Sequence, residues 1–147
     1  MASQIYYEDI EIGDSLPTLT KHPTPRQLVM WAGASGDYYE IHYDKDFALS
    51  QGLPGIIVHG MLTASFIGQL LTDWMGELGT LAKFRTSNRG MLLPNQDVIC
   101  KGTVTRKYSE GGKNYVECEA WAENEKGEKA VLSTALVALP ARSGAAA

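Results

Sequence analysis

The sequence predicts an α+β domain in which a curled antiparallel sheet wraps around one long, apolar helix. The helix is predicted because residues 61–75 are apolar or small at nearly every position, with large side chains spread around the whole circumference. After Gly76 the pattern changes to the two-residue period of strands. The four segments with this period are residues 80–88, 97–108, 114–123 and 129–138. A helix without a solvent-exposed (wet) face must be buried by other elements, and the long antiparallel strands are the elements available to pack around it.

The length and composition indicate one globular domain. A chain of 147 residues is long enough for one sizeable core and short for two domains. We assign residues 1–140 to this domain and expect residues 141–147 to form a frayed tail. With 44% hydrophobic and 20% charged residues, the chain does not belong to the disordered or low-complexity classes. A net charge of −4, with no run of like charges, disfavours a nucleic-acid partner.

Several features predict a cytoplasmic protein that is not inserted in a membrane. Residues 1–7 lack the basic and apolar regions of a secretory signal. Residues 53–72 carry no formal charge apart from the one His59 can take, yet their Pro, Gly, Gln, Ser and Thr content favours a buried segment over a membrane span. Cys100 and Cys118 fall in neighbouring predicted strands without metal-ligand or redox-motif spacing. We therefore expect reduced, buried thiols.

The first helix is predicted to begin at Thr24 and to end near Ser35. Thr24 can cap the helix, Pro25 suits the first helical position, and Gln27 completes a capping-box pattern. One face of this helix collects Leu28, Trp31, Ala32 and Ser35. Gly36 follows directly, and a glycine favours the end of a helix.

Two further helices follow, and the strands come after them. A short helix is capped by Asp44 and ends at Gly52, and the long apolar helix begins at His59-Gly60. Among the strands, residues 110–112 and 124–127 are hairpin connections. Between these turns, small or apolar Val116, Cys118, Ala120 and Ala122 alternate with Glu117, Glu119, Trp121 and Glu123. This alternation predicts one buried face and one solvated face.

A carboxylate and an imidazole, Asp37 and His42, lie five residues apart between two predicted helices. On a continuous helix this spacing separates the side chains by about 140° in azimuth. On a strand they would be about 17 Å apart and on opposite faces. Only a bent loop brings them together, where they would form an acid/base pair. The alternative is that Asp37 ends its helix in an Asx-turn while His42 is a satisfied, half-buried histidine.

The dipeptide His59-Gly60 at the start of the apolar helix is a second candidate region. The unpaired amides and the positive end of the helix dipole favour a developing oxyanion there, and a glycine leaves its amide open to close approach. The alternative for His59 is a histidine packed at a helix N-terminus. The third histidine, His22, lies next to Pro23 and has no evident partner in the sequence.

The residues around the acid/base pair resemble a known family. Residues 36–44 read Gly-Asp-Tyr-Tyr-Glu-Ile-His-Tyr-Asp and are followed by Phe47-Ala48. This pattern resembles the MaoC-like dehydratases, or (R)-specific enoyl-CoA hydratases, whose signature is Gly-Asp-x-Asn-Pro-Ile/Leu-His-x-Asp with an aromatic-Ala pair after it. Residues 57–63 and 93–97 resemble the family's entry to its central helix and its Pro-x-Gly-Asp turn. Tyr39 and Glu40 depart from the family's usual Asn and Pro.

The resemblance implies a hot-dog fold, with dimers whose sheets join edge to edge. It also implies an acyl thioester substrate, usually on CoA, and a role in fatty acid metabolism. Carried over position by position, Asp37 and His42 would activate a water, and the amide of Gly60 would take the thioester oxygen. The implied reaction is the reversible addition of water to a trans-2-enoyl-CoA, giving a (3R)-hydroxyacyl-CoA.

Further residues are candidates for substrate binding. One group consists of the three tyrosines beside the pair, Tyr38, Tyr39 and Tyr43, together with His59 at the start of the apolar helix. The alternative role of each of these residues is packing. Those that can meet CoA phosphates by charge-assisted bonds are Arg85, Asn88 and Arg89, with a solvated basic rim as the alternative. We expect no metal and no cofactor beyond the CoA of the substrate, because the sequence has no nucleotide fingerprint or metal-ligand spacing.

Two other functions remain open at this point. One is a hot-dog thioesterase, because the fold alone does not fix the reaction. The other is a subunit that needs a second hot-dog chain. Otherwise we expect a homodimer or a higher homo-oligomer, since natural proteins protect the unpaired edge of a sheet.

Overall fold

The computed structural model describes residues 3–142. It contains one five-stranded antiparallel sheet with the order β1-β3-β4-β5-β2. The strands are β1 (Leu19–Lys21), β2 (Thr80–Asn88), β3 (Val98–Glu110), β4 (Lys113–Glu123) and β5 (Lys129–Leu139). The α-helices are α1 (Pro25–Ser35), α2 (Lys45–Ser50) and α3 (Gly60–Met75), and short 3-10 turns span Tyr7–Asp9 and Glu40–His42. The predicted α+β class is confirmed.

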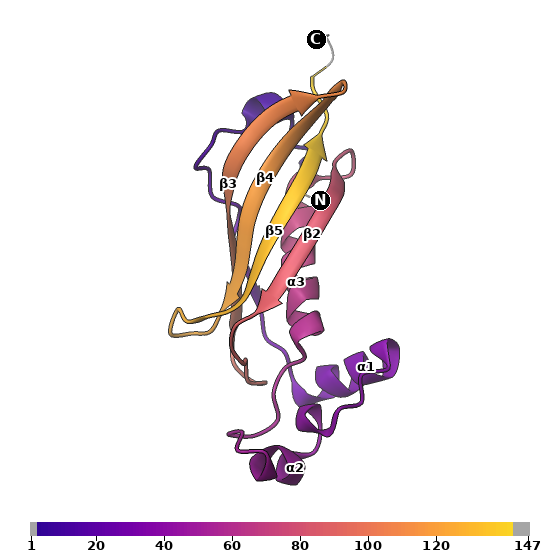
Figure 1. Cartoon of the computed structure of the whole chain (residues 1–147), viewed down its shortest axis with the longest axis vertical. Helices are drawn as coiled ribbons and strands as arrows, with labels where there is room; N and C mark the ends of the chain where they lie inside the picture. The colour runs from indigo at the N-terminus through magenta and orange to yellow at the C-terminus, as the bar shows by residue number, and fades with distance from the viewer. Residues whose placement is uncertain (1–2, 143–147) are drawn as a thin grey trace.

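The sheet curves over α3, which runs along one of its faces (Figure 1). The predicted alternation is confirmed for Val116, Cys118, Ala120 and Ala122, which are all buried, but it is wrong for Glu123, which was predicted on the solvated face and is buried as well. The strand β1 is an element that the sequence analysis did not predict. It pairs with β3, with Leu19 opposite Cys100, but three residues are too few to show an alternating pattern.

The helix α3 supplies much of the core, but the prediction that it lacks a wet face is wrong. Its buried side chains are Leu62, Thr63, Ala64, Phe66, Ile67, Leu70, Leu71 and Met75. Met61 is 62% exposed, and Ser65, Gln69, Thr72 and Asp73 continue the exposed stripe. The sheet covers only one side of the helix. The exposed stripe is difficult to recognise in the sequence because it begins with an apolar residue, Met61.

The helices α1 and α2 lie together beyond the end of the sheet, near the start of α3 (Figure 1). Their predicted caps are confirmed. Thr24 Oγ1 accepts the amide hydrogen of Gln27 at 3.3 Å, and Asp44 Oδ1 accepts that of Phe47 at 3.0 Å. The loop between the two helices is therefore bounded by Gly36, which ends α1, and by Asp44, which caps the start of α2.

The two cysteines lie in the core, and Arg142 is the last residue that the structure describes. Cys100 and Cys118 are free and buried on neighbouring strands, as predicted, and burial raises the pKa of each thiol to about 12. Of the expected tail, residues 143–147 lie outside the described residues. Arg142 lies inside them, and its guanidinium pairs with the Asp9 carboxylate at 2.7 Å.

Candidate active site

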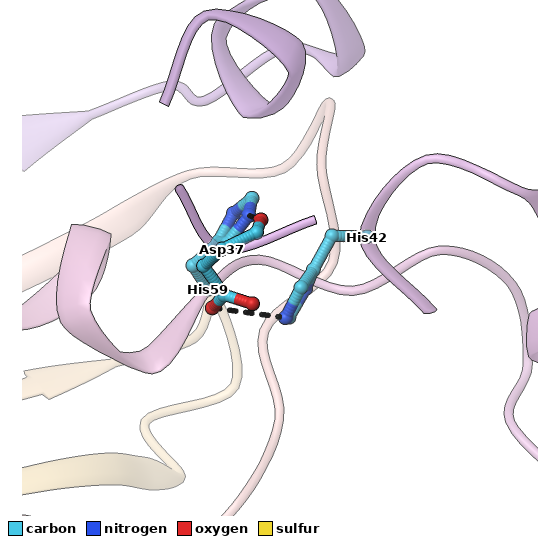
Figure 2. Close-up of side chains that lie close together, drawn as sticks. All are labelled: Asp37, His42 and His59. Carbon is cyan, nitrogen blue, oxygen red and sulfur yellow. Dashed lines mark hydrogen bonds and ion pairs between the residues drawn. The ribbon is translucent and has the colours of Figure 1, made fainter. Parts of the chain in front are cut away.

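Asp37 and His42 come together in the loop between α1 and α2, in the bent geometry that their spacing requires. Gly36 ends α1 in the left-handed conformation, with φ at 79°, and turns the chain away from the helix axis. The 3-10 turn Glu40–His42 then brings the imidazole back toward the carboxylate. Asp37 Oδ2 and His42 Nε2 lie 3.8 Å apart (Figure 2).

The Asx-turn considered as an alternative for Asp37 is present, and it involves only one of the two carboxylate oxygens. Tyr39 donates its amide hydrogen to Asp37 Oδ1 at 3.3 Å, and the amide of Asp37 donates to Ser35 Oγ at 3.2 Å. These bonds hold the carboxylate in place while Oδ2 faces His42. The turn and the acid/base geometry are therefore compatible.

The buried His42 ring has its tautomer fixed by the backbone. Its Nδ1 lies 2.8 Å from the carbonyl oxygen of Ile57, and a carbonyl only accepts, so Nδ1 carries the hydrogen. In the neutral ring the lone pair is then on Nε2, which faces Asp37 Oδ2. Two acceptors 3.8 Å apart form no direct hydrogen bond, but a water molecule can donate one hydrogen to each.

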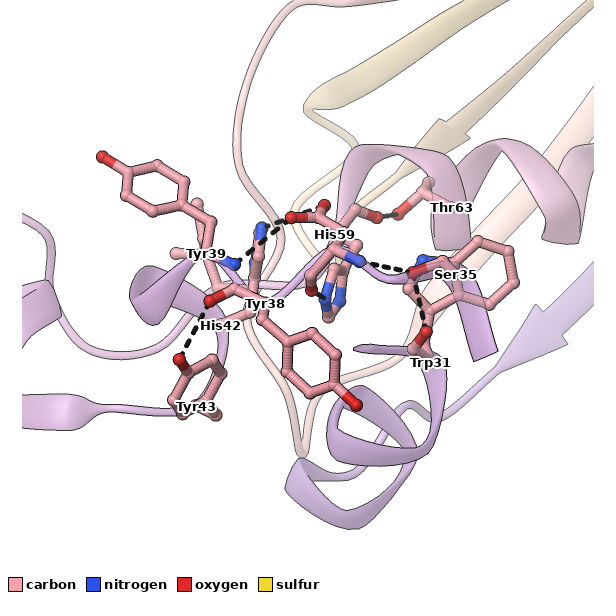
Figure 3. Close-up of polar contacts among 10 residues, drawn as sticks. Trp31, Ser35, Tyr38, Tyr39, His42, Tyr43, His59 and Thr63 are labelled. Carbon is pink, nitrogen blue, oxygen red and sulfur yellow. Dashed lines mark hydrogen bonds and ion pairs between the residues drawn. The ribbon is translucent and has the colours of Figure 1, made fainter. Parts of the chain in front are cut away.

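His59 is completely buried and contacts both members of the pair. Its ring stacks on the His42 ring, with centroids 3.8 Å apart and planes inclined by 20°. Its Nε2 donates to the carbonyl oxygen of Asp37 at 3.3 Å (Figure 3). Burial first, and then the proximity of His42, lowers the pKa of His59 below its usual value. Sequence reasoning treated His59 and the pair separately, because 22 residues separate Asp37 from His59.

The same three side chains also have the residue types of a metal centre. Asp37, His42 and His59 each offer a ligand atom, and these atoms lie within 4.8 Å of one another. A histidine binds a metal through a lone pair in its ring plane, and stacked, nearly parallel rings do not aim two such lone pairs at one point. The bonds of His42 Nδ1 and His59 Nε2 to backbone carbonyls leave one nitrogen of each ring free, so it is the stacking alone that disfavours a metal. The geometry favours an acid/base pair over a metal centre.

Gly60 is the first residue of α3, directly after His59. An amide at this position has no partner within the helix. A Cβ on Gly60 would lie 2.8 Å from Asn88 Oδ1 and closer still to Asn88 Nδ2. The glycine therefore gives the Asn88 side chain room to lie against the start of α3.

The three tyrosines of the loop, Tyr38, Tyr39 and Tyr43, are exposed, and Tyr39 contacts His42. The Tyr43 hydroxyl donates to the carbonyl oxygen of Tyr38 at 2.9 Å, which closes the loop (Figure 3). The Tyr39 ring meets both His42 and Phe47 edge-on. Tyr39 thus packs directly beside the pair, at a position where the resemblance expects an asparagine.

The structure separates the three residues expected at the CoA phosphates. Asn88 lies against Gly60, whereas Arg85 and Arg89 line a cavity of about 390 Å³ together with Lys129 and Trp121. That cavity opens on the outer face of the sheet, since Trp121 alternates with the buried, inward-facing small residues of β4. The lining of this cavity does not include Asp37 or His42.

A contact that the sequence did not reveal involves His22. Its Nδ1 lies 2.8 Å from Asp97 Oδ1, and both side chains are about half exposed. This pair ties the segment before α1 to the turn before β3, and it lies apart from the three clustered side chains.

The chain is similar to a known protein family over the region that holds this site. The family model described as "MaoC like domain" matches residues 9–126, which is most of the chain. The chain belongs to the MaoC-like domain family. The match includes Asp37, His42, His59 and Gly60.

Three curated relatives of this MaoC-like chain match over parts of their length. It is 40% identical over 79 residues to the fatty acid synthase beta subunit TOXC of Cochliobolus carbonum, covering 52% of this chain and 4% of that one. It is 32% identical over 65 residues to the 3-oxo-4,17-pregnadiene-20-carboxyl-CoA hydratase beta subunit of Mycobacterium tuberculosis, covering 44% and 50%. It is 36% identical over 66 residues to an (R)-specific enoyl-CoA hydratase of Rhodospirillum rubrum, covering 45% and 45%. The matches span half or less of these relatives.

Solved structures support the predicted hot-dog fold of the MaoC-like chain. The (R)-hydratase of A. caviae superposes with a TM-score of 0.81 and 25% identity, covering 90% of this chain and 99% of that one. The R-hydratase PhaJ1 of Pseudomonas aeruginosa gives a TM-score of 0.85 at 24% identity, covering 95% and 88%. The hot-dog fold is confirmed. Within the described residues, no helix is both long and apolar enough to cross a membrane.

Proposed function

We propose that this protein catalyses the reversible addition of water to a trans-2-enoyl-CoA, giving a (3R)-hydroxyacyl-CoA. The observation that carries the proposal is the 3.8 Å gap between Asp37 Oδ2 and His42 Nε2, two acceptors that face each other. A water in this gap donates a hydrogen to each of them, which orients its oxygen lone pairs away from the pair and toward a substrate.

The chemistry follows from this arrangement. As the water oxygen bonds to C3, one member of the pair takes one water proton and the C2=C3 π electrons move toward the thioester; the same proton is then delivered to C2, which regenerates the pair. The negative charge moves to the thioester oxygen and is stabilised by the amide of Gly60 at the positive end of α3. We treat Asp37 and His42 as a coupled pair and assign no separate acid and base roles.

The substrate would be held by residues around this centre. Tyr38, Tyr39 and Tyr43 are proposed to line the acyl site, and Asn88 lies close enough to the start of α3 to contact the thioester region. We retain Arg85 and Arg89 as candidates for the CoA phosphates, now placed on the outer face of the sheet. The reaction needs no cofactor other than the CoA of the substrate.

The experiment that tests the proposal uses the purified chain and a panel of trans-2-enoyl-CoA thioesters of increasing length. We expect loss of the conjugated-thioester absorbance, and chiral analysis should show the (3R)-hydroxyacyl product. Asp37→Asn is the matched control, because an asparagine can still accept the Tyr39 amide hydrogen but carries no charge. A parent protein without hydratase activity on any member of the panel would refute the proposal. Release of free thiol from a saturated acyl-CoA would establish the thioesterase alternative.

We further propose that the chain acts as a homo-oligomer, most simply a dimer through β2. Among residues 3–142 this strand pairs only with β5, and a nine-residue edge strand is open to pairing. Two free, buried cysteines fit a reducing compartment such as the cytoplasm.

A second candidate is a subunit role. The similarity to the beta subunit of a hydratase from Mycobacterium tuberculosis favours it, as do the departures at Tyr39 and Glu40. In this case the purified chain alone would be inactive, and a second hot-dog chain would co-purify with it.

A further inference from the structure

We infer that His59 is a positioning residue that fixes both Asp37 and His42 relative to the start of α3. The inference rests on the proposed function, since it assigns His59 a part in the same reaction. It differs from the expectation that His59 contacts substrate. His59 has none of its surface exposed, its Nε2 bonds to the Asp37 carbonyl and its ring stacks on His42, so the contacts of the ring in the structure are with the pair.

The first contact holds the backbone of Asp37. A carbonyl oxygen only accepts, so the bond of 3.3 Å requires the hydrogen of His59 to be on Nε2. This bond acts on the main chain at Asp37, while the Asx-turn to Tyr39 acts on its side chain. Together they restrain both the position and the rotation of a carboxylate that is otherwise half exposed.

The second contact holds the ring of His42. The His59 ring covers one face of that ring at a centroid distance of 3.8 Å, and the bond from His42 Nδ1 to Ile57 fixes the rotation of the ring in its own plane. An imidazole restrained in both ways keeps Nε2 directed at Asp37. The stacked neighbour therefore contributes to the 3.8 Å gap in which the water is proposed to lie.

His59 is itself fixed by α3. It is the residue before the first turn, its carbonyl oxygen accepts the Thr63 amide hydrogen at 3.1 Å, and its ring is fully buried. Gly60, the proposed oxyanion donor, is the next residue. One dipeptide thus sets the distance between the group that stabilises the thioester oxygen and the pair that handles the water. A shift of about 1 Å between such groups can lower a rate by about 100-fold.

The test compares two variants that each remove one contact. His59→Phe keeps a flat ring that can stack on His42 but lacks the N–H that bonds to Asp37. His59→Gln keeps an N–H donor but lacks the ring. Leu71→Ala is the control, because Leu71 is a fully buried residue of α3 that is far along the helix from the pair. It should lower the melting temperature without changing the turnover of the folded fraction.

We expect kcat per folded molecule to fall by about 10-fold to 100-fold in both His59 variants, with KM changed by less than about twofold. Parental kcat in both folded variants would overturn the inference. A rise in KM at unchanged kcat would also overturn it and would indicate a direct substrate contact.

A second measurement does not depend on activity. The probe is hydrogen exchange at the Tyr39 amide, which bonds to the Asp37 carboxylate. Exchange there should be faster in His59→Phe than in the parent and faster than in Leu71→Ala. The three proteins are compared under conditions that give them equal free energies of unfolding. Unchanged exchange would contradict the positioning role. If the parent shows no hydratase activity, the proposed function fails, and this exchange measurement still decides whether His59 holds the loop.

Discussion

Asp37 and His42 approach each other through one carboxylate oxygen and one ring nitrogen, while their remaining polar atoms are bound to the backbone. Removing either group removes the chemistry of this approach, and His42→Ala also loses the bond to Ile57 and the stack on His59, so folding has to be measured separately. We expect Asp37→Asn and His42→Ala each to lower hydration by about 100-fold or more. The measurement is turnover of crotonyl-CoA and of a longer enoyl-CoA that the parent accepts, with melting temperatures to verify folding. Near-parental turnover by either variant would show that the pair is wrongly assigned.

Gly60 allows two explanations that a double variant can separate. Gly60→Val should lower activity, either because the side chain obstructs the thioester or because it displaces Asn88. Adding Asn88→Ala makes room for the new side chain, so the melting temperature should recover. We expect kcat to stay low in Gly60→Val/Asn88→Ala, measured against Asn88→Ala alone. Recovery of kcat would mean that the glycine only accommodates Asn88, and the oxyanion role would be abandoned.

His59 should make the stability of the fold depend on pH. Its folded pKa is lowered from the ordinary value of 6.5, so below pH 6.5 the unfolded chain binds a proton more readily than the folded one. Stability is therefore fully present above pH 6.5 and decreases as pH falls toward the lowered pKa. Urea unfolding at pH 7.5 and 5.5 should show a larger loss for the parent than for His59→Phe. Equal losses would indicate that His59 is not held neutral.

The oligomeric state follows from the exposed side of β2. We expect light scattering at micromolar concentration to give at least twice the 16.0 kDa of one chain. A stable species of 16.0 kDa would contradict this expectation, and a complex with a different hot-dog chain would favour the subunit role.

Local chemistry made most of the fold predictable. Thr24 and Asp44 cap their helices through bonds to residues three positions later, so the signal lies within one turn of sequence. The long strands were predictable because inward-facing and outward-facing residue types alternate along each strand over several pairs of residues. Glu123 breaks this pattern. It lies on the side predicted to be solvated, yet it is buried, at a point where the register between β4 and β5 shifts. Lys101 and Trp121 both bond to its carboxylate, and these bonds lower its pKa.

The site was less predictable, because its decisive contacts join distant segments. The spacing of Asp37 and His42 showed only that a bent loop was needed, and the resemblance supplied the expectation that they meet. No local signal links Asn88 to Gly60 or His59 to Asp37, since these contacts depend on how β2, α3 and the loop are assembled. The His59-Gly60 dipeptide at a helix start was the one available hint.

The position of β2 has a consequence for how assembly and catalysis are connected. This strand is at the border of the sheet, and its last residue, Asn88, rests on Gly60. A neighbouring chain that pairs with β2 would form hydrogen bonds to the same strand whose last residue packs against the start of α3. Dissociation would then loosen β2 and the proposed oxyanion site together, so specific activity would fall on dilution even though Asp37, His42 and Gly60 belong to a single chain.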